Sequence, residues 1–136
     1  MTDLQPHRLL SLPKLSLPSV RSLPAHQYGL AIHTASPELG LAIANFVHSA
    51  PHLAGEAASH NRYQIWDLGR AMSTQLHDHL IEFLPPQTWT DLAFLAVARG
   101  PGGFTGTRIG VVTARTLAQQ LQIPLFAIST LAAVAW

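Results

Sequence analysis

The amino-acid sequence predicts an α/β fold, a mixed five-stranded sheet with helices on its faces. Short apolar stretches of strand length follow residue 27, and the first two are separated by a turn short enough for a hairpin. Two longer segments further along carry apolar residues at helical spacing. A glycine-rich turn joins an apolar strand to the second of these helices. The element order is therefore β-β-β-α-β-α-β, for which we expect the strand order 3-2-1-4-5.

The first three strands are short and mostly apolar or alternating. We place them at Tyr28–Ser36, Leu39–Phe46 and Asn61–Leu68, with Pro37-Glu38 as the link between the first two. Residues 47–60, between the second and third strands, are polar and rich in small side chains. We expect this segment to be a surface connection.

We expect no metal site within residues 47–60. His48, His52 and Glu56 are spaced four apart, which would align them on one face of a helix. Pro51 and Gly55 oppose such a helix, so the three side chains are not expected to converge on a metal ion.

Two helices are predicted from apolar periodicity. The first spans Gly69–Leu84 and ends at Pro85-Pro86, because proline restricts the residue before it and cannot continue the helical hydrogen bonds. The second spans Thr107–Gln122, where the small residues Gly110 and Ala114 would let another helix approach closely. The remaining elements are strands at Leu92–Ala98 and Leu125–Ser129 and the start of a further helix at Thr130.

Composition limits the functions open to the chain. It has 136 residues, 48% of them hydrophobic and only 11% charged, which is enough for one domain with a substantial core. A net charge of +1, with Lys14 as the only lysine, provides no basic stripe for tight binding to nucleic acid. The absence of cysteine excludes disulfides and cysteine-ligated metals, and fits a cytoplasmic location. No apolar run has the length of a membrane span, so we expect no membrane partner.

Residues 1–27 differ from the rest of the chain. The tripeptide Ser-Leu-Pro occurs three times between Ser11 and Pro24, and prolines at this frequency prevent a helix and interrupt strand pairing. We expect a disordered arm rich in proline, serine and leucine. Two explanations stay open, a proline-rich ligand for a partner domain and a start codon assigned too early.

The segment from Gly100 to Gly110 joins a strand to a helix and contains five glycines. It is not a Walker A loop, because no lysine precedes a serine or threonine at the required position. It is not a dinucleotide fingerprint either, because Thr105 stands where the third glycine is needed. Thr105 could cap the helix, and the free N–H groups at the helix start favour an anion or a carbonyl oxygen.

This segment, Gly-Pro-Gly-Gly-Phe-Thr-Gly-Thr-Arg-Ile-Gly, resembles the G-P-G-S-F-T-G-x-R-I-G block of the TsaB (YeaZ) family, with Gly103 in place of the serine. That family belongs to the tRNA threonylcarbamoyladenosine machinery and to the actin-like/Hsp70-like ATPase superfamily. The resemblance covers residues 28–136. It implies a ribonuclease-H-like lobe that is followed in the family by a second, similar lobe. The expected second lobe would lie after Trp136, so the sequence is either a fragment or a protein that has lost this lobe, and its end within an apolar helix favours a fragment.

The resemblance implies an accessory role rather than catalysis. A TsaB-like chain would be a non-catalytic dimerisation subunit that supports a TsaD-like transferase, with a TsaE-like ATPase completing the assembly and tRNA bound only through the complex. Homodimerisation is left open. The chain itself would need no cofactor, and any ATP and Mg²⁺ are expected at the level of the complex. His33 stands where the family has an aspartate, and an imidazole is a poor ligand for Mg²⁺.

The family pattern also implies site residues. The helices Gly69–Leu84 and Thr107–Gln122 would form the contact with TsaD. The expected partner-binding residues are Met72, Leu76, Leu80, Phe104, Arg108, Gly110, Ala114 and Leu117. Nucleotide contact, if the loop retains it, would come from Thr34, Ser36, Gly102, Gly103 and Thr105. We expect no catalytic residue and no metal ligand.

One alternative function is an enzyme of the same superfamily, an ATP-binding, kinase-like protein whose second lobe is missing. A ribonuclease-H-like nuclease is disfavoured, because it would gather several carboxylates over the sheet to hold metal ions, and the chain has only seven acidic residues.

Overall fold

The computed structural model describes residues 28–46 and 61–135; the predicted arm (1–27) and the connection 47–60 lie outside the described residues. The strands are β1 (Tyr28–His33), β2 (Glu38–Asn45), β3 (Arg62–Asp67), β4 (Leu92–Ala98) and β5 (Leu125–Ile128). The helices are α1 (Met72–Phe83), α2 (Phe104–Leu121) and α3 (Thr130–Val134), with short 3₁₀ turns η3 (Gly69–Ala71) and η4 (Trp89–Asp91).

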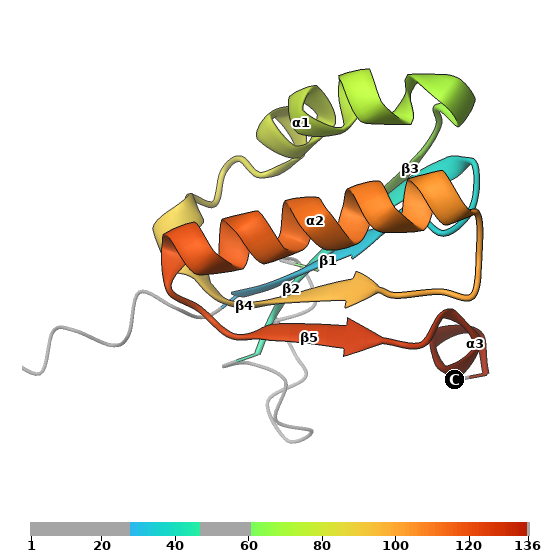
Figure 1. Ribbon diagram of the computed structural model, residues 1–136. Helices are drawn as coiled ribbons and strands as arrows, with labels where there is room; N and C mark the ends of the chain where they lie inside the picture. Colours follow the sequence, from blue (N-terminus) through green and yellow to red (C-terminus); the bar gives the residue numbers. More distant parts are fainter. Residues whose placement is uncertain (1–27, 47–60, 136) are drawn as a thin grey trace, which may run out of the picture.

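The five strands form one sheet in the order β3-β2-β1-β4-β5. β1 pairs antiparallel with β2, and β2 antiparallel with β3, whereas β1–β4 and β4–β5 are parallel. The predicted α/β class, mixed sheet and strand order are therefore confirmed. Both long helices, α1 and α2, lie on the same face of this sheet (Figure 1).

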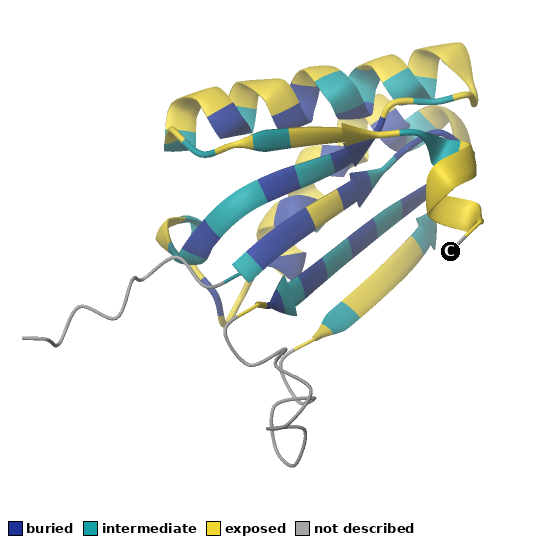
Figure 2. Cartoon of the chain, turned by 90° about the horizontal axis from the view of Figure 1, so that it is seen from below, coloured by how far each residue is buried: buried dark blue, intermediate teal, exposed yellow. Residues whose placement is uncertain are grey.

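The core lies between that face and the two helices. Alternate residues of β1, β2 and β4 point into it, which is the period-two pattern of strands with one buried face. The edge strands β3 and β5 are mostly exposed (Figure 2). The buried apolar side chains from the helices are Met72, Leu76, Leu80 and Phe83 of α1 and Ala114 and Ala118 of α2.

The second helix begins earlier than the sequence indicated. α2 starts at Phe104 instead of Thr107, and Gly103 is its N-cap residue. The N–H of Thr107 donates to the carbonyl oxygen of Gly103 at 2.9 Å, which is the first hydrogen bond of the helix. Apolar periodicity could not reveal this first turn. Of its four residues, Phe104–Thr107, two are threonines on either side of a glycine, and none of the four is buried.

Arg62 connects β3 to the carboxyl end of α1. Its guanidinium donates to the carbonyl oxygens of Phe83 and Leu84 at 2.6 and 2.7 Å and to the side chain of Gln87. It also lies over the Phe83 ring, 4.9 Å from the centroid. Partial burial lowers the pKa of Arg62. The group satisfies carbonyls that the end of a helix leaves without partners.

We expect Arg62→Met to lower the free energy of unfolding by about 2–3 kcal/mol, because three buried or half-buried acceptors lose a charged donor. Arg62→Lys should lose less, since an ammonium keeps the charge but not the planar fork. Urea denaturation measures both. Arg115→Met is the control, because Arg115 is exposed on α2 and should change stability by no more than about 0.5 kcal/mol. Equal losses for Arg62→Met and Arg115→Met would contradict this role.

Candidate functional site

The glycine-rich loop packs directly on the turn between β1 and β2. The N–H of Gly103 donates to the carbonyl oxygen of Ala35 at 2.8 Å. In the reverse direction, the hydroxyl of Thr34 donates to the carbonyl oxygen of Gly106 at 2.7 Å. Thr34 is fully buried. These two hydrogen bonds fasten the start of α2 to the carboxyl end of β1.

Three glycines spaced four apart, Gly102, Gly106 and Gly110, make this contact sterically possible. A Cβ at Gly106 would lie 2.5 Å from the carbonyl oxygen of Thr34, closer than real Cβ contacts come. A Cβ at Gly102 would collide with Ala35, and one at Gly110 with the hydroxyl of Thr34. We call these three residues the glycine lane. Their lack of side chains lets the helix and the turn touch backbone to backbone.

The residues predicted for nucleotide contact are mostly engaged within the chain. The hydroxyl of Thr34 is bonded to Gly106, and that of Ser36 donates to the carbonyl oxygen of Glu38 at 3.4 Å. Gly102 is pressed against Ala35, while Gly103 has room for a side chain. Thr105 does not cap α2, which corrects the expectation, because the helix has already begun and Thr105 lies exposed in its first turn. Nucleotide contact by this set stays a prediction.

Two hollows flank the first turn of α2. The first, of about 580 Å³, lies between the β1–β2 turn, the start of α1 and the start of α2, and Arg70, Ser73 and Ile109 contribute to its wall. The second, of about 540 Å³, lies between the Arg99–Gly102 loop and α2, with Arg108 and Val112 on the helix side. Phe104 lines both. The hydroxyl of Thr107, on the wall of the second hollow, is buried and has no hydrogen-bond partner among the described residues.

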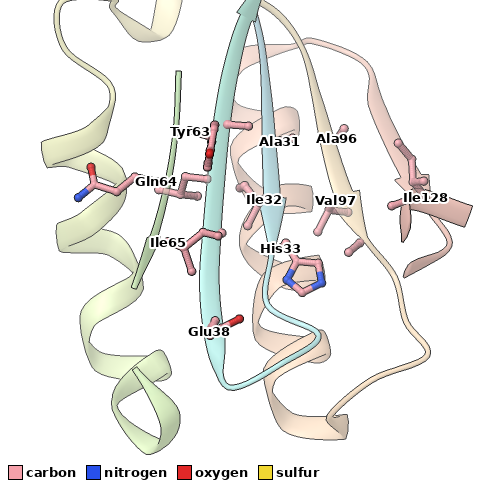
Figure 3. Close-up of a pocket in the computed structure, with 15 residues that line it drawn as sticks. Ala31, Ile32, His33, Glu38, Tyr63, Gln64, Ile65, Ala96, Val97 and Ile128 are labelled. Atoms are coloured by element: carbon pink, nitrogen blue, oxygen red, sulfur yellow. The ribbon is translucent and has the colours of Figure 1, made fainter. Parts of the chain in front are cut away.

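A third hollow, of about 380 Å³, lies on the sheet face opposite α1 and α2 (Figure 3). Its floor consists of small residues of the central strands, including Ala31, Gly40 and Ala96, and Tyr63 and Ile65 of β3 border it. Tyr63 and Ile65 are 78% and 58% exposed. Within the described segments, no helix covers this face apart from Ala133 of α3 at its border. It is a shallow apolar groove with little polar chemistry.

His33 lies at the end of this groove with Glu38 (Figure 3). It is half-buried and is the last residue of β1, which ends three residues earlier than the predicted strand Tyr28–Ser36. In the two described ranges, no group of three histidine or acidic side chains could hold a metal ion. The site around His33 therefore offers an imidazole beside an apolar surface and no cluster of carboxylates.

The predicted partner-binding residues divide into two sets. Met72, Leu76 and Leu80 are at most 3% exposed, because they face the sheet from α1. Gly110 and Ala114 are also buried, against Thr34 and the core. Leu117 packs on the core as well. Met72, Leu76, Leu80, Gly110 and Ala114 are corrected to residues of the chain's own core. Leu117 is half-buried, and Phe104 and Arg108 are exposed on α2, so a partner contact by these three residues stays a prediction.

The exposed side of the two helices was missed by the sequence analysis. Ile81 of α1 is 63% exposed and Val112 of α2 is 55% exposed. Both lie on the outward side of their helix, because at about 100° per residue they fall far from the mean direction of the buried residues of the same helix. We call the outward residues of the two helices the helical surface. Its members are Thr74, His77 and Ile81 of α1 and Phe104, Arg108 and Val112 of α2. The sequence does contain a signal for the helical surface, because Phe104, Arg108 and Val112 recur every four residues on the side of α2 away from its buried residues.

The chain is similar to proteins of one tRNA-modification pathway. A family model described as TsaD, tRNA N6-adenosine threonylcarbamoyltransferase, matches residues 74–136. The chain is 53% identical over 45 residues to the tRNA threonylcarbamoyladenosine biosynthesis protein TsaB of Bacillus subtilis (strain 168), covering 33% of this chain and 20% of that protein. It is 40% identical over 67 residues to TsaB of Buchnera aphidicola subsp. Schizaphis graminum (strain Sg), covering 43% and 32%.

Solved structures share the fold. YeaZ from Pseudomonas aeruginosa superposes with a TM-score of 0.67 at 24% identity, covering 80% of this chain and 46% of that one. An uncharacterized protein with similarity to peptidase YEAZ from Pseudomonas aeruginosa has a TM-score of 0.66 at 25% identity, with the same coverage. The chain thus spans about half the length of these solved proteins and a smaller part of its curated relatives.

The glycine lane can be tested by a change that helix propensity alone would favour. Alanine in place of glycine inside a helix usually stabilises by up to about 1 kcal/mol. At Gly106 we expect the opposite, a loss of about 1–3 kcal/mol, because the added methyl group meets the Thr34 carbonyl. Thermal and urea unfolding measure the change.

Gly103→Ala is the matched control, because the nearest atom to its Cβ would be the Ala35 oxygen at 3.8 Å. Its effect should stay within about 1 kcal/mol, the range of a changed N-cap residue. A Gly106→Ala variant that is as stable as the wild type would refute the close packing.

Proposed function

We propose that the chain is a TsaB/YeaZ-like protein that acts in threonylcarbamoyladenosine biosynthesis as an accessory subunit and binds a TsaD-like transferase. The family is supported by the TsaB proteins named above and by the YeaZ fold. Since those matches span only part of the relatives, the partnership with a TsaE-like ATPase and the contact with tRNA through the complex belong to the same proposal.

The accessory role is supported by the chemistry available on the chain. Transfer of a threonylcarbamoyl group needs groups that position a nucleotide, bind its metal and activate the acceptor amine. At the carboxyl end of β1 the chain offers His33, and the polar groups of Thr34 and Ser36 are bonded within the chain. The glycine loop is occupied in holding α2 against the β1–β2 turn. These features favour a structural function for the loop.

The observation that carries the proposed partner contact is the helical surface. α1 and α2 lie next to each other on one face of the sheet, with their apolar stripes turned inward (Figure 1). Outward they still present Ile81, Val112 and Phe104. Exposed apolar residues on two neighbouring helices suit packing against helices of a partner, in which ridges of side chains fit into grooves.

The described residues contain no helix that is long and apolar enough to cross a membrane. A cytoplasmic location is part of the proposal, since it is where an assembly that modifies tRNA would meet its substrate.

We expect Ile81→Asp and Val112→Asp each to weaken co-purification with a TsaD-like subunit by at least about tenfold, because a carboxylate would be desolvated in an apolar contact. Both side chains are exposed in the chain, so folding should be retained, which circular dichroism would verify. Affinity is measured by pull-down and titration calorimetry with the purified transferase subunit.

Ile65→Asp is the matched control. Ile65 is exposed to a similar extent, 58% against 63% for Ile81, but it lies on the opposite sheet face. Its replacement should leave co-purification unchanged. If Ile65→Asp abolished binding and Ile81→Asp did not, the proposed contact would be on the wrong side of the sheet.

A further inference from the structure

The surface around the first turn of α2 contains an exposed aromatic ring. Phe104 is 79% exposed and makes no ring contact with the other aromatic side chains of the described segments. It separates the two hollows beside α2, because it lines both. Isolated exposed apolar residues are common, so this ring becomes informative through its neighbours.

Three exposed arginines line the same hollows. Arg70 lies in the wall of the first, and Arg99 and Arg108 lie in the wall of the second. In the described part of the chain, none of their guanidinium groups has an ion pair or a hydrogen bond, in contrast to Arg62 at the end of α1. No acidic residue lines either hollow or occupies the first turn of α2.

We propose that Phe104, Arg70, Arg99 and Arg108 form an anchor for an acidic segment of a protein partner; these four residues are the aromatic–arginine cluster. Carboxylates of the segment pair with the guanidinium groups, whose planar forks suit bidentate contacts. An apolar side chain of the segment packs against the Phe104 ring and enters a hollow. The partial positive charge at the start of α2 adds to the attraction.

The chemistry of the cluster favours a protein over RNA. Affinity for RNA grows with the number of phosphates that cations neutralise, and three arginines on a chain of net charge +1 neutralise few. Arginine and aromatic residues are enriched in protein–protein contacts, and lysine is depleted there. Lys14 is the only lysine of the chain, and it lies outside the described residues. The inference rests on the proposed function only for the identity of the partner.

The experiment uses the full chain and three fluorescein-labelled probes. These are a peptide of four Glu-Glu-Leu repeats, the same peptide with glutamine for glutamate, and an oligouridylate of equal length. Fluorescence anisotropy reports the affinity. The salt concentration is about 0.15 M, because charges more than about 8 Å apart are then largely screened and only close charge pairs contribute. We expect the acidic peptide to bind at least about tenfold more tightly than the glutamine peptide.

Variants identify the cluster as the binding site. Arg99→Glu combined with Arg108→Glu should weaken the acidic peptide at least about tenfold, and Phe104→Ala should weaken it several-fold. Arg115→Glu is the matched control, because Arg115 is exposed on the same helix and lines neither hollow. It should change the affinity by less than about twofold. Thermal unfolding verifies that each variant is folded.

Several results would overturn the inference: absence of acidic-peptide binding, equal affinity for the glutamine peptide, an equal loss in Arg115→Glu, or tighter binding of the oligouridylate. The proposed function fails separately. If the wild-type chain binds the acidic peptide through the cluster but does not co-purify with a TsaD-like subunit, the cluster stands and that partner is wrong. If Ile81→Asp abolishes co-purification with the TsaD-like subunit while the cluster variants still co-purify with it normally, the cluster is not an anchor for that partner.

Discussion

The close approach of α2 to the β1–β2 turn is the constraint on which the rest of the structure depends. The glycine lane brings the helix backbone against Thr34 and Ala35, at a separation that no side chain would permit. Two hydrogen bonds, from Thr34 to Gly106 and from Gly103 to Ala35, fix the direction in which the helix leaves the loop. This direction places Ala114 and Ala118 over the sheet and turns Phe104 and Arg108 outward.

The two long helices are attached to the sheet by different interactions, and together they form one stable helical layer over it. α2 is held by steric fit at its amino end, whereas α1 is held at its carboxyl end by the charged group of Arg62. Between these attachments, both helices bury one apolar stripe against β1, β2 and β4. A surface fixed in this way loses little conformational freedom when a partner binds, which favours affinity.

The sequence predicted the architecture well, because alternation in strands such as the predicted Leu39–Phe46 and the helical period through Leu76 and Leu80 depend only on local pattern. It did not predict which apolar residues face a partner. Met72, Ala114 and other core residues have the same chemistry as contact residues, and only tertiary packing separates the two. The start of α2 was missed because Phe104–Thr107 has no apolar period. The Arg62 contacts join residues about 21 positions apart, which no local pattern reveals.

The open sheet face has a consequence for how this protein can vary between species. Its floor is made of the smallest side chains, among them Ala31, Gly40 and Ala96, and its rim of larger ones such as Tyr63. With nothing over them in the described residues, larger side chains on the floor would cost the isolated chain little. Any element that packed there would meet the strand backbone closely and would forbid such replacements. If larger side chains are found on this floor in related proteins, the face is open in the cell; if only small ones are found, another element covers it. This distinction does not depend on the stability of the chain by itself.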